Sequence, residues 1–237
     1  MTSLTPAQAE FVDSVVRLRP RVATFDCDGT LWSGDAGEGF FSWELEQGLV
    51  SKEIQRWARS RYADYRAGNV PEEIMCGGMV TMHRGLREEV VQQAADDYFP
   101  KGIATNIFPE MLALVRRLRG DGCDVWAVSS SNLWIIRAGM RYFDIPPDRI
   151  LAAETAVENG TILDRLTRVP SGPGKSEAIR EAIRGAPDCA FGNSIWDREM
   201  LAMSKHPFAI NPNLNLKEIA ITNGWKVYEP DTNHSGR

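Results

Sequence analysis

The stretch Asp26-Cys27-Asp28-Gly29-Thr30 decides how this chain of 237 residues is read. It directly follows the apolar run Val22-Ala23-Thr24-Phe25, which is typical of a buried strand, and its glycine predicts a turn. Two carboxylates therefore stand close together at the end of a strand. Such a pair can share one hard cation, and one carboxylate can act as a nucleophile while the other moves a proton. A simple Asp-rich turn has the same sequence, so the interpretation depends on the rest of the chain.

Further polar residues stand at the ends of other apolar runs. The run Val125-Trp126-Ala127-Val128 leads into Ser129-Ser130-Ser131-Asn132, so a second strand brings hydroxyl and amide groups to its carboxyl end. Lys175 begins an amphipathic segment, and a third strand ends just before Asn193 and Asp197. Because the carboxyl ends of parallel strands form one edge of a sheet, we expect these residues to meet there.

The order of the elements predicts the fold class. Nearly continuous apolar strands alternate with helical segments, which is typical of an α/β protein whose parallel sheet carries helices on both faces. Apolar spacing predicts helices at 5–18, 107–118, 133–142 and 176–184. Further strands are expected near residue 150, at 189 and at 207–210. From 33 to 105 the pattern is helical almost throughout, at 40–49, 53–65, 72–82 and 88–99. The tail, 231–237, is expected to be disordered.

Taken in order, these four motifs resemble those of the haloacid dehalogenase superfamily, specifically its phosphatases of the phosphoserine phosphatase type. The resemblance covers most of the chain, from residue 21 to residue 211. It implies a Rossmann-like catalytic core at 1–33 and 106–237, with an inserted helical cap domain at 34–105. It also implies a Mg²⁺-dependent phosphomonoester hydrolase that works through a phospho-aspartate intermediate.

The resemblance assigns roles to the first and last motifs. Asp26 would be the nucleophile, and Asp28 would protonate the leaving alcohol and then activate water. Mg²⁺ would be held by the Asp26 carboxylate, the backbone carbonyl of Asp28 and Asn193. Asp197 would orient Lys175 or a metal-bound water. Family members usually carry Asp where this chain has Asn193, so the site loses one negative charge and we expect weaker metal binding.

The two middle motifs would hold the phosphate. Ser129 matches the phosphate-binding residue of the second motif, although Ser130 is an alternative. Lys175 lies in a segment similar to a nucleotide-binding P-loop, but Val169 stands where that motif requires glycine, and a P-loop is rejected. The resemblance instead implies that Lys175 bridges the nucleophile and the phosphate. Thr30 could support the turn or the Asp28 backbone, or it could be a simple turn residue.

Substrate selection is expected in the cap and just after the first motif. Asp35 and Glu38 could recognise a cationic group, although both could equally be acidic residues at a helix start. Four tryptophans could form an aromatic wall, a role less common than packing: Trp32, Trp43, Trp57 and Trp134. Five arginines could meet a substrate carboxylate: Arg56, Arg59, Arg61, Arg66 and Arg84. A small polar metabolite similar to phosphoserine is favoured.

Several alternatives to that function stay open. The substrate could be phosphocholine, phosphoethanolamine or a sugar phosphate. A phosphotransferase or phosphomutase would use the same first half-reaction. A non-catalytic phospho-ligand binder would follow if Asn193 had abolished turnover.

Composition limits the partners and the location. A net charge of −5 without a run of Lys or Arg argues against nucleic-acid binding. No apolar stretch reaches the length of a membrane span, and Met1-Thr2-Ser3 does not resemble a signal peptide, so no membrane partner is expected. The 4 cysteines lack metal-binding spacing and the 3 histidines are scattered, which favours reduced thiols in a cytoplasmic protein without zinc.

Overall fold

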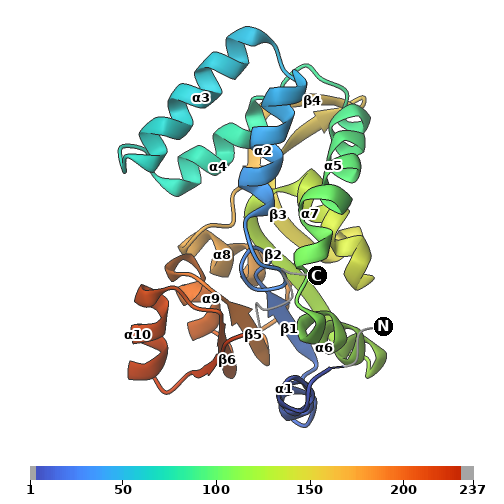
Figure 1. Cartoon of the computed structure of the whole chain (residues 1–237), viewed down its shortest axis with the longest axis vertical. Helices are drawn as coiled ribbons and strands as arrows, with labels where there is room; N and C mark the ends of the chain where they lie inside the picture. Colours follow the sequence, from blue (N-terminus) through green and yellow to red (C-terminus); the bar gives the residue numbers. More distant parts are fainter. Residues whose placement is uncertain (1–3, 231–237) are drawn as a thin grey trace.

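The sheet of the protein has seven strands in the order β4-β3-β2-β1-β5-β6-β7 (Figure 1). The computed structural model describes residues 4–230, so the predicted disorder of 231–237 lies outside the described residues. The strands are β1 (Val22–Phe25), β2 (Asp124–Asn132), β3 (Ile150–Glu158), β4 (Thr161–Arg168), β5 (Cys189–Gly192), β6 (His206–Ile210) and β7 (Lys226–Tyr228). All neighbours pair in parallel except β3 and β4. The predicted α/β class is confirmed, with one antiparallel strand at the edge.

That edge strand, β4, is absent from the sequence prediction. Most of its side chains are exposed, so it lacks the apolar run that marks the central strands. The turn before it does carry a signal, because Asn159 and Gly160 both have positive φ angles, of 51° and 73°. Asn-Gly between two strands is the usual sequence of a two-residue hairpin. The turn was therefore predictable even though the strand was not.

Helices cover both faces of the sheet because β2 alternates its side chains between them. Val125 and Ala127 pack with α1 (Pro6–Val16), α6 (Pro109–Gly120) and α7 (Leu133–Met140). Trp126 and Val128 pack with α8 (Pro173–Ala182), α9 (Arg198–Ala202) and α10 (Leu214–Thr222). Short 3₁₀ turns lie at Ala104–Asn106, Arg141–Phe143, Pro147–Arg149 and Ile195–Asp197. No helix among residues 4–230 combines the length and hydropathy that crossing a bilayer requires.

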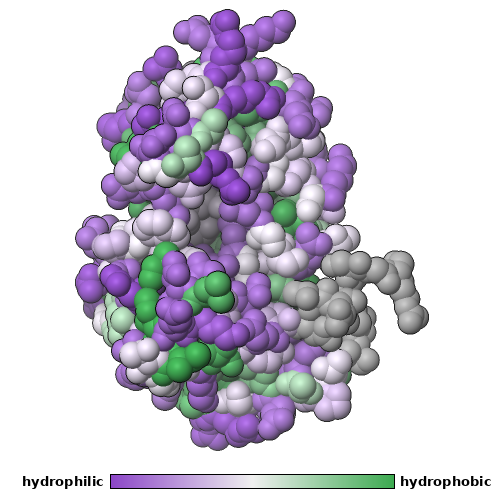
Figure 2. Space-filling view, turned by 60° about the vertical axis from the view of Figure 1, so that its left-hand side comes forward, coloured by the Kyte–Doolittle hydropathy of each residue, from purple (hydrophilic) through white to green (hydrophobic). Residues whose placement is uncertain are grey.

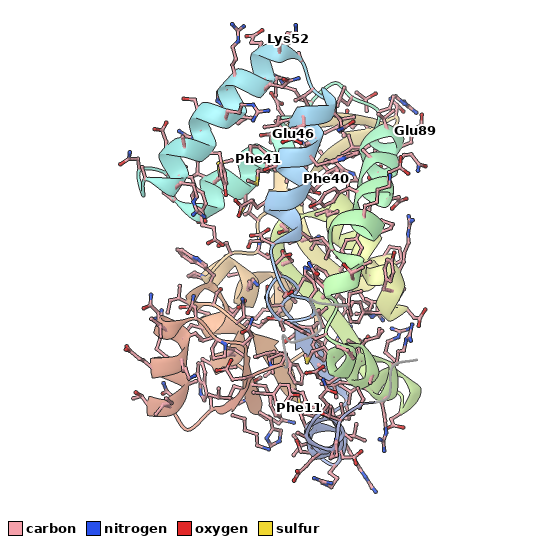
Figure 3. All side chains as sticks on the ribbon, viewed as in Figure 1. Phe11, Phe40, Phe41, Glu46, Lys52 and Glu89 are labelled. Atoms are coloured by element: carbon pink, nitrogen blue, oxygen red, sulfur yellow. The ribbon has the colours of Figure 1, made fainter. Side chains whose placement is uncertain are left out.

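Four helices between β1 and α6 lie beyond the carboxyl end of the sheet (Figure 1), and we call them the cap helices. They are α2 (Ala36–Gln47), α3 (Lys52–Arg66), α4 (Glu72–Thr81) and α5 (Glu88–Gly102), close to the segments that apolar spacing predicts. Consecutive phenylalanines on α2 point to opposite sides (Figure 3). Phe40 joins the main core with α5, and Phe41 joins a separate apolar cluster with α3 and α4. The domain boundaries at 34 and 105 remain a prediction.

A buried hydrogen-bonded pair, Glu44 and His83, ties α2 to the end of α4. Glu44 Oε2 lies 2.7 Å from His83 Nε2, and both side chains are completely buried. His83 Nδ1 contacts the backbone carbonyl of Val80 at 3.1 Å, so this nitrogen is the donor of that bond. Glu44 thus satisfies the second ring nitrogen in a place where water does not reach.

Replacing Glu44 by Ala is expected to lower the free energy of unfolding by about 3–5 kcal/mol, because one member of a buried pair is left without its partner. The control is Glu46→Ala on the same helix, where the side chain is exposed (Figure 3) and the expected change is within about 0.5 kcal/mol. Urea unfolding of both variants measures the difference. An equal loss of unfolding free energy in the two variants would show that the Glu44–His83 pair contributes nothing to stability beyond helix propensity.

Candidate active site

A cavity of about 420 Å³ lies between the carboxyl edge of the sheet and the cap helices. In the space-filling view the surface is hollowed between the upper helices and the sheet below (Figure 2). Residues from all four sequence motifs line this cavity, among them Asp26, Asp28, Ser130, Lys175 and Asn193. The sheet edge therefore gathers the motif residues, as strand order predicts.

The centre of the site is a lysine held between two carboxylates. Lys175 Nζ donates to Asp26 Oδ1 and to Asp197 Oδ1, each at 2.6 Å, and to the backbone carbonyl of Val128 at 3.1 Å. Burial alone would lower the pKa of Lys175, but Asp197 and Asp26 raise it well above its ordinary value. The lysine therefore stays charged and fixed beside Asp26, where it can neutralise an incoming anion.

Asp26 ends the apolar strand β1 and is itself almost completely buried. Thr30 donates its hydroxyl to Asp26 Oδ2 at 2.8 Å, so both carboxylate oxygens have fixed directions. Burial raises the pKa of Asp26 to about 7, Asp197 adds to this effect, and Lys175 opposes it. A carboxylate held in this way has lost most of its hydration, which favours its use as a nucleophile.

Asp28 has a different environment from Asp26. Its Oδ1 accepts from the indole Nε1 of Trp32 at 2.8 Å and from the backbone N–H of Ala36 at 2.6 Å. Its Oδ2 accepts from the hydroxyl of Ser131 at 2.7 Å. Burial raises the pKa of Asp28 to about 7, with Asp35 adding to the effect. A carboxyl group with a pKa near neutrality can both give and take a proton.

Gly29 lets the last motif approach the first. Its φ angle is +76°, and a Cβ atom there would lie 1.8 Å from Asn193 Nδ2. Any side chain at this position would displace Asn193 and would also strain the backbone. Asp197 fixes the loop that carries Asn193, because its Oδ2 accepts from the backbone N–H groups of Asn193 and Ser194, each at 2.9 Å.

The three serines of the second motif differ in position. Ser129 is buried and does not line the cavity; its Oγ accepts from the backbone N–H of Ser131 at 3.1 Å. Ser130 and Ser131 line the cavity instead. The strand continues to Asn132 with a register shift after Val128, which apolar patterning alone did not show.

A family model described as haloacid dehalogenase-like hydrolase matches residues 23–202 of the chain, which contain all of these motif residues. The chain belongs to this family. The predicted membership of this superfamily and the predicted hydrolase class are confirmed.

Named relatives of this haloacid dehalogenase-like hydrolase include phosphatases. It is 27% identical to a probable phosphatase of Mycobacterium tuberculosis, over 88% of this chain and 76% of that protein. It is 24% identical to a histidinol-phosphatase of Neisseria meningitidis, over 87% of this chain and 97% of that protein. Among solved structures, a substrate-bound phosphoserine phosphatase complex matches with a TM-score of 0.56 and 18% identity, over 84% of this chain and 89% of that chain, which supports the fold.

The donor atoms near Asp26 fit Mg²⁺, the metal that this haloacid dehalogenase-like family implies. Carboxylate, amide and backbone carbonyl oxygens are the ligands that such a hard cation prefers. The Asn193 side chain lies against Gly29, within the first motif, with Nδ2 nearest to it, and a flip of the amide would present the oxygen there. Among residues 4–230, no three His, Cys, Asp or Glu side chains form a metal-binding group, so these ligands would act with waters and the substrate.

The cap side of the cavity agrees only in part with the sequence expectations. Asp35 and Glu38 do line it, and Asp35 also caps α2 by accepting from the backbone N–H of Glu38 at 2.7 Å. Among the five arginines, Arg66 lines the cavity and the other four do not. The hypothesis of a tryptophan wall is wrong, because none of its members lines the cavity: Trp32, Trp43, Trp57 and Trp134. Trp32 and Trp134 are buried in the core instead.

Sequence reasoning missed several residues that line the cavity: Tyr62, Tyr65, Glu72, Met75, Cys76, Met79, Trp196 and Asn211. Most of them lie on α3 and α4. Helical spacing shows that these helices are amphipathic, but it does not show which turn of a helix covers a cavity in another part of the chain.

Proposed function

We propose that this protein is a Mg²⁺-dependent phosphomonoester hydrolase that forms a phospho-aspartate at Asp26. The observation that carries the proposal is the Asp26–Lys175–Asp197 network at the floor of the cavity. A buried carboxylate beside a fixed cation suits attack on a phosphate, because the cation reduces the repulsion between two anions. The phosphatases among the named relatives support the same reaction class.

The residues around Asp26 would then have different roles in the reaction. An oxygen of Asp26 attacks phosphorus and the bond to the leaving alcohol breaks, while Asp28 gives that alcohol a proton. Asp28 then takes a proton from the water that cleaves the aspartyl phosphate. Lys175 and the backbone N–H groups at the end of β2, where Ser130 and Ser131 line the cavity, would hold the phosphate oxygens.

Mg²⁺ would be held by Asp26, the backbone carbonyl of Asp28 and Asn193, and when bound it would supply positive charge beside the phosphate. Asp197 is already engaged with Lys175 and the loop backbone, which supports a positioning role rather than direct metal binding. Thr30 supports Asp26 through its hydroxyl.

Replacing Asn193 by Asp is expected to lower the Mg²⁺ concentration needed for half-maximal activity by about 10-fold, because a charged ligand replaces a neutral one at a cation. Titrating Mg²⁺ into the chelator-treated wild type and the variant measures this. Asn159→Asp is the control, because Asn159 is exposed in the turn between β3 and β4 and does not line the cavity. Unchanged metal dependence in the Asn193 variant would remove Asn193 from the ligand set.

The substrate we propose is a small polar phosphomonoester, with a phosphoserine-like compound favoured. The cavity volume of about 420 Å³ suits a metabolite, and its cap side offers both acidic groups and Arg66. We also propose a cytoplasmic location and a cap domain at 34–105. Free cysteines at positions 27, 76, 123 and 189 support the former, and the four cap helices support the latter.

Phosphate release from a panel of esters tests the proposed function. The panel contains phosphoserine, phosphocholine, phosphoethanolamine, sugar phosphates and nucleotides, each with Mg²⁺ and with EDTA. We expect release that EDTA stops and added Mg²⁺ restores. Release that is unaffected by chelation would contradict the metal-dependent scheme, and no release from any ester by the folded protein would favour a phospho-ligand binder.

A further inference from the structure

Among residues 4–230, Glu72 is the one cap side chain that forms hydrogen bonds with residues at the phosphate end of the cavity. It stands in the first turn of α4, and its Oε1 accepts two hydroxyl groups of the core. Ser130 donates at 3.2 Å from the end of β2, and Ser171 donates at 2.9 Å from the turn before α8. Neither the motifs nor the metal site uses this carboxylate.

The contacts of Glu72 leave one of its oxygens for a ligand. Among residues 4–230, no group donates a hydrogen bond to Oε2, and the side chain lines the cavity. Burial raises the pKa of Glu72, and Ser171, Lys175 and Ser130 oppose this rise only in part. A carboxylate in this position lacks a cation of its own and is placed to receive one from a ligand.

The charges around the cavity point to the same kind of ligand. Lys175 is hydrogen-bonded to Asp26 and Asp197, and its charge offsets that of Glu72 only in part. On the cap side, three carboxylates line the cavity against one arginine: Asp35, Glu38 and Glu72 against Arg66. A leaving group that carries a positive charge would balance this excess, whereas a neutral or anionic one would not.

We infer that Glu72 is a specificity-determining residue that pairs with a cationic group on the leaving alcohol of the substrate. This inference rests on the proposed phosphatase function. The substrates it selects are phosphomonoesters of amino alcohols, with an ammonium group a few bonds from the ester oxygen. The two serine contacts fix the Glu72 carboxylate beside the phosphate position, so that the site recognises the phosphate and the ammonium group of such a substrate at the same time.

The test compares two esters of equal shape, 2-aminoethyl phosphate and n-propyl phosphate, which differ in an ammonium against a methyl group. We expect wild type to prefer the amino ester in kcat/KM, and Glu72→Gln to reduce this preference by about 10- to 100-fold, mainly through KM. The amide oxygen of Gln can still accept both serine hydroxyls, so the fold and the cap position are kept. Thermal unfolding of the variant checks this.

The control is Glu73→Gln, because Glu73 is the next residue on α4 and is exposed. It is expected to keep the wild-type preference. The inference is overturned if wild type hydrolyses both esters equally, or if Glu72→Gln lowers kcat/KM for both by the same factor, which would make Glu72 a structural link between cap and core. Failure of wild type to hydrolyse any ester, in this pair or in the larger panel, overturns the proposed function and this inference with it.

Discussion

Asp26→Asn is expected to reduce kcat by about 10⁴-fold or more, because an amide oxygen does not replace a carboxylate as nucleophile. The fold should be kept, since Asn can still accept the Thr30 hydroxyl and Lys175 keeps its bond to Asp197. Phosphate release from the preferred ester measures the loss.

The control for this prediction is Asp188→Asn, which changes a half-buried carboxylate at the opposite end of β1, where it accepts from the backbone N–H groups of Arg21 and Val22 and pairs with Lys205. Its activity should match wild type. Circular dichroism and urea unfolding confirm that the Asp26 variant is folded. Activity within about tenfold of wild type would mean that another group attacks the phosphate.

Asp28→Asn is expected to reduce kcat by about 10²–10⁴-fold, the range typical of lost general acid–base catalysis. Asn at this position can still accept from Trp32 and Ala36, so the backbone around the turn should be unchanged. The amide nitrogen of Asn would replace the oxygen that accepts from Ser131, and the Ser131 hydroxyl can rotate to accept from it.

A change of leaving group makes the test of Asp28 sharper. An alkyl ester needs a proton on its departing oxygen, whereas p-nitrophenolate leaves readily without one. If phosphorylation of Asp26 limits the rate, the loss in kcat/KM for Asp28→Asn should be much smaller with p-nitrophenyl phosphate than with the alkyl ester. Equal losses with both esters would assign Asp28 a structural role.

The centre of the site was predictable from the sequence because it depends on topology. Asp26 and Lys175 are far apart along the chain, yet both belong to motifs at the carboxyl edge of one sheet. In the structure, Lys175 Nζ lies 2.6 Å from Asp26 Oδ1. Asn193 reaches the same edge because Gly29 leaves room for it. Parallel strands converge in this way whatever the details of packing.

What the sequence did not predict depends on local geometry or on contacts between distant elements. The choice between Ser129 and Ser130 depends on a register shift in β2, which alternation does not encode. Glu72 reaches the site only because α4 lies over β2 and α8, so its spacing on the helix gave no signal. The sequence also did not show that Trp32 is buried in the core and does not line the cavity.

The most direct test of the account is the chemical identity of the covalent intermediate. The enzyme is mixed with its preferred ester and Mg²⁺, quenched in acid and reduced with borohydride, which converts an acyl phosphate on aspartate to homoserine. Peptide mass spectrometry then locates the change. The account predicts homoserine at position 26, and none in Asp26→Asn. Phosphate release with no reduced residue at position 26, or with one at another carboxylate, would contradict it.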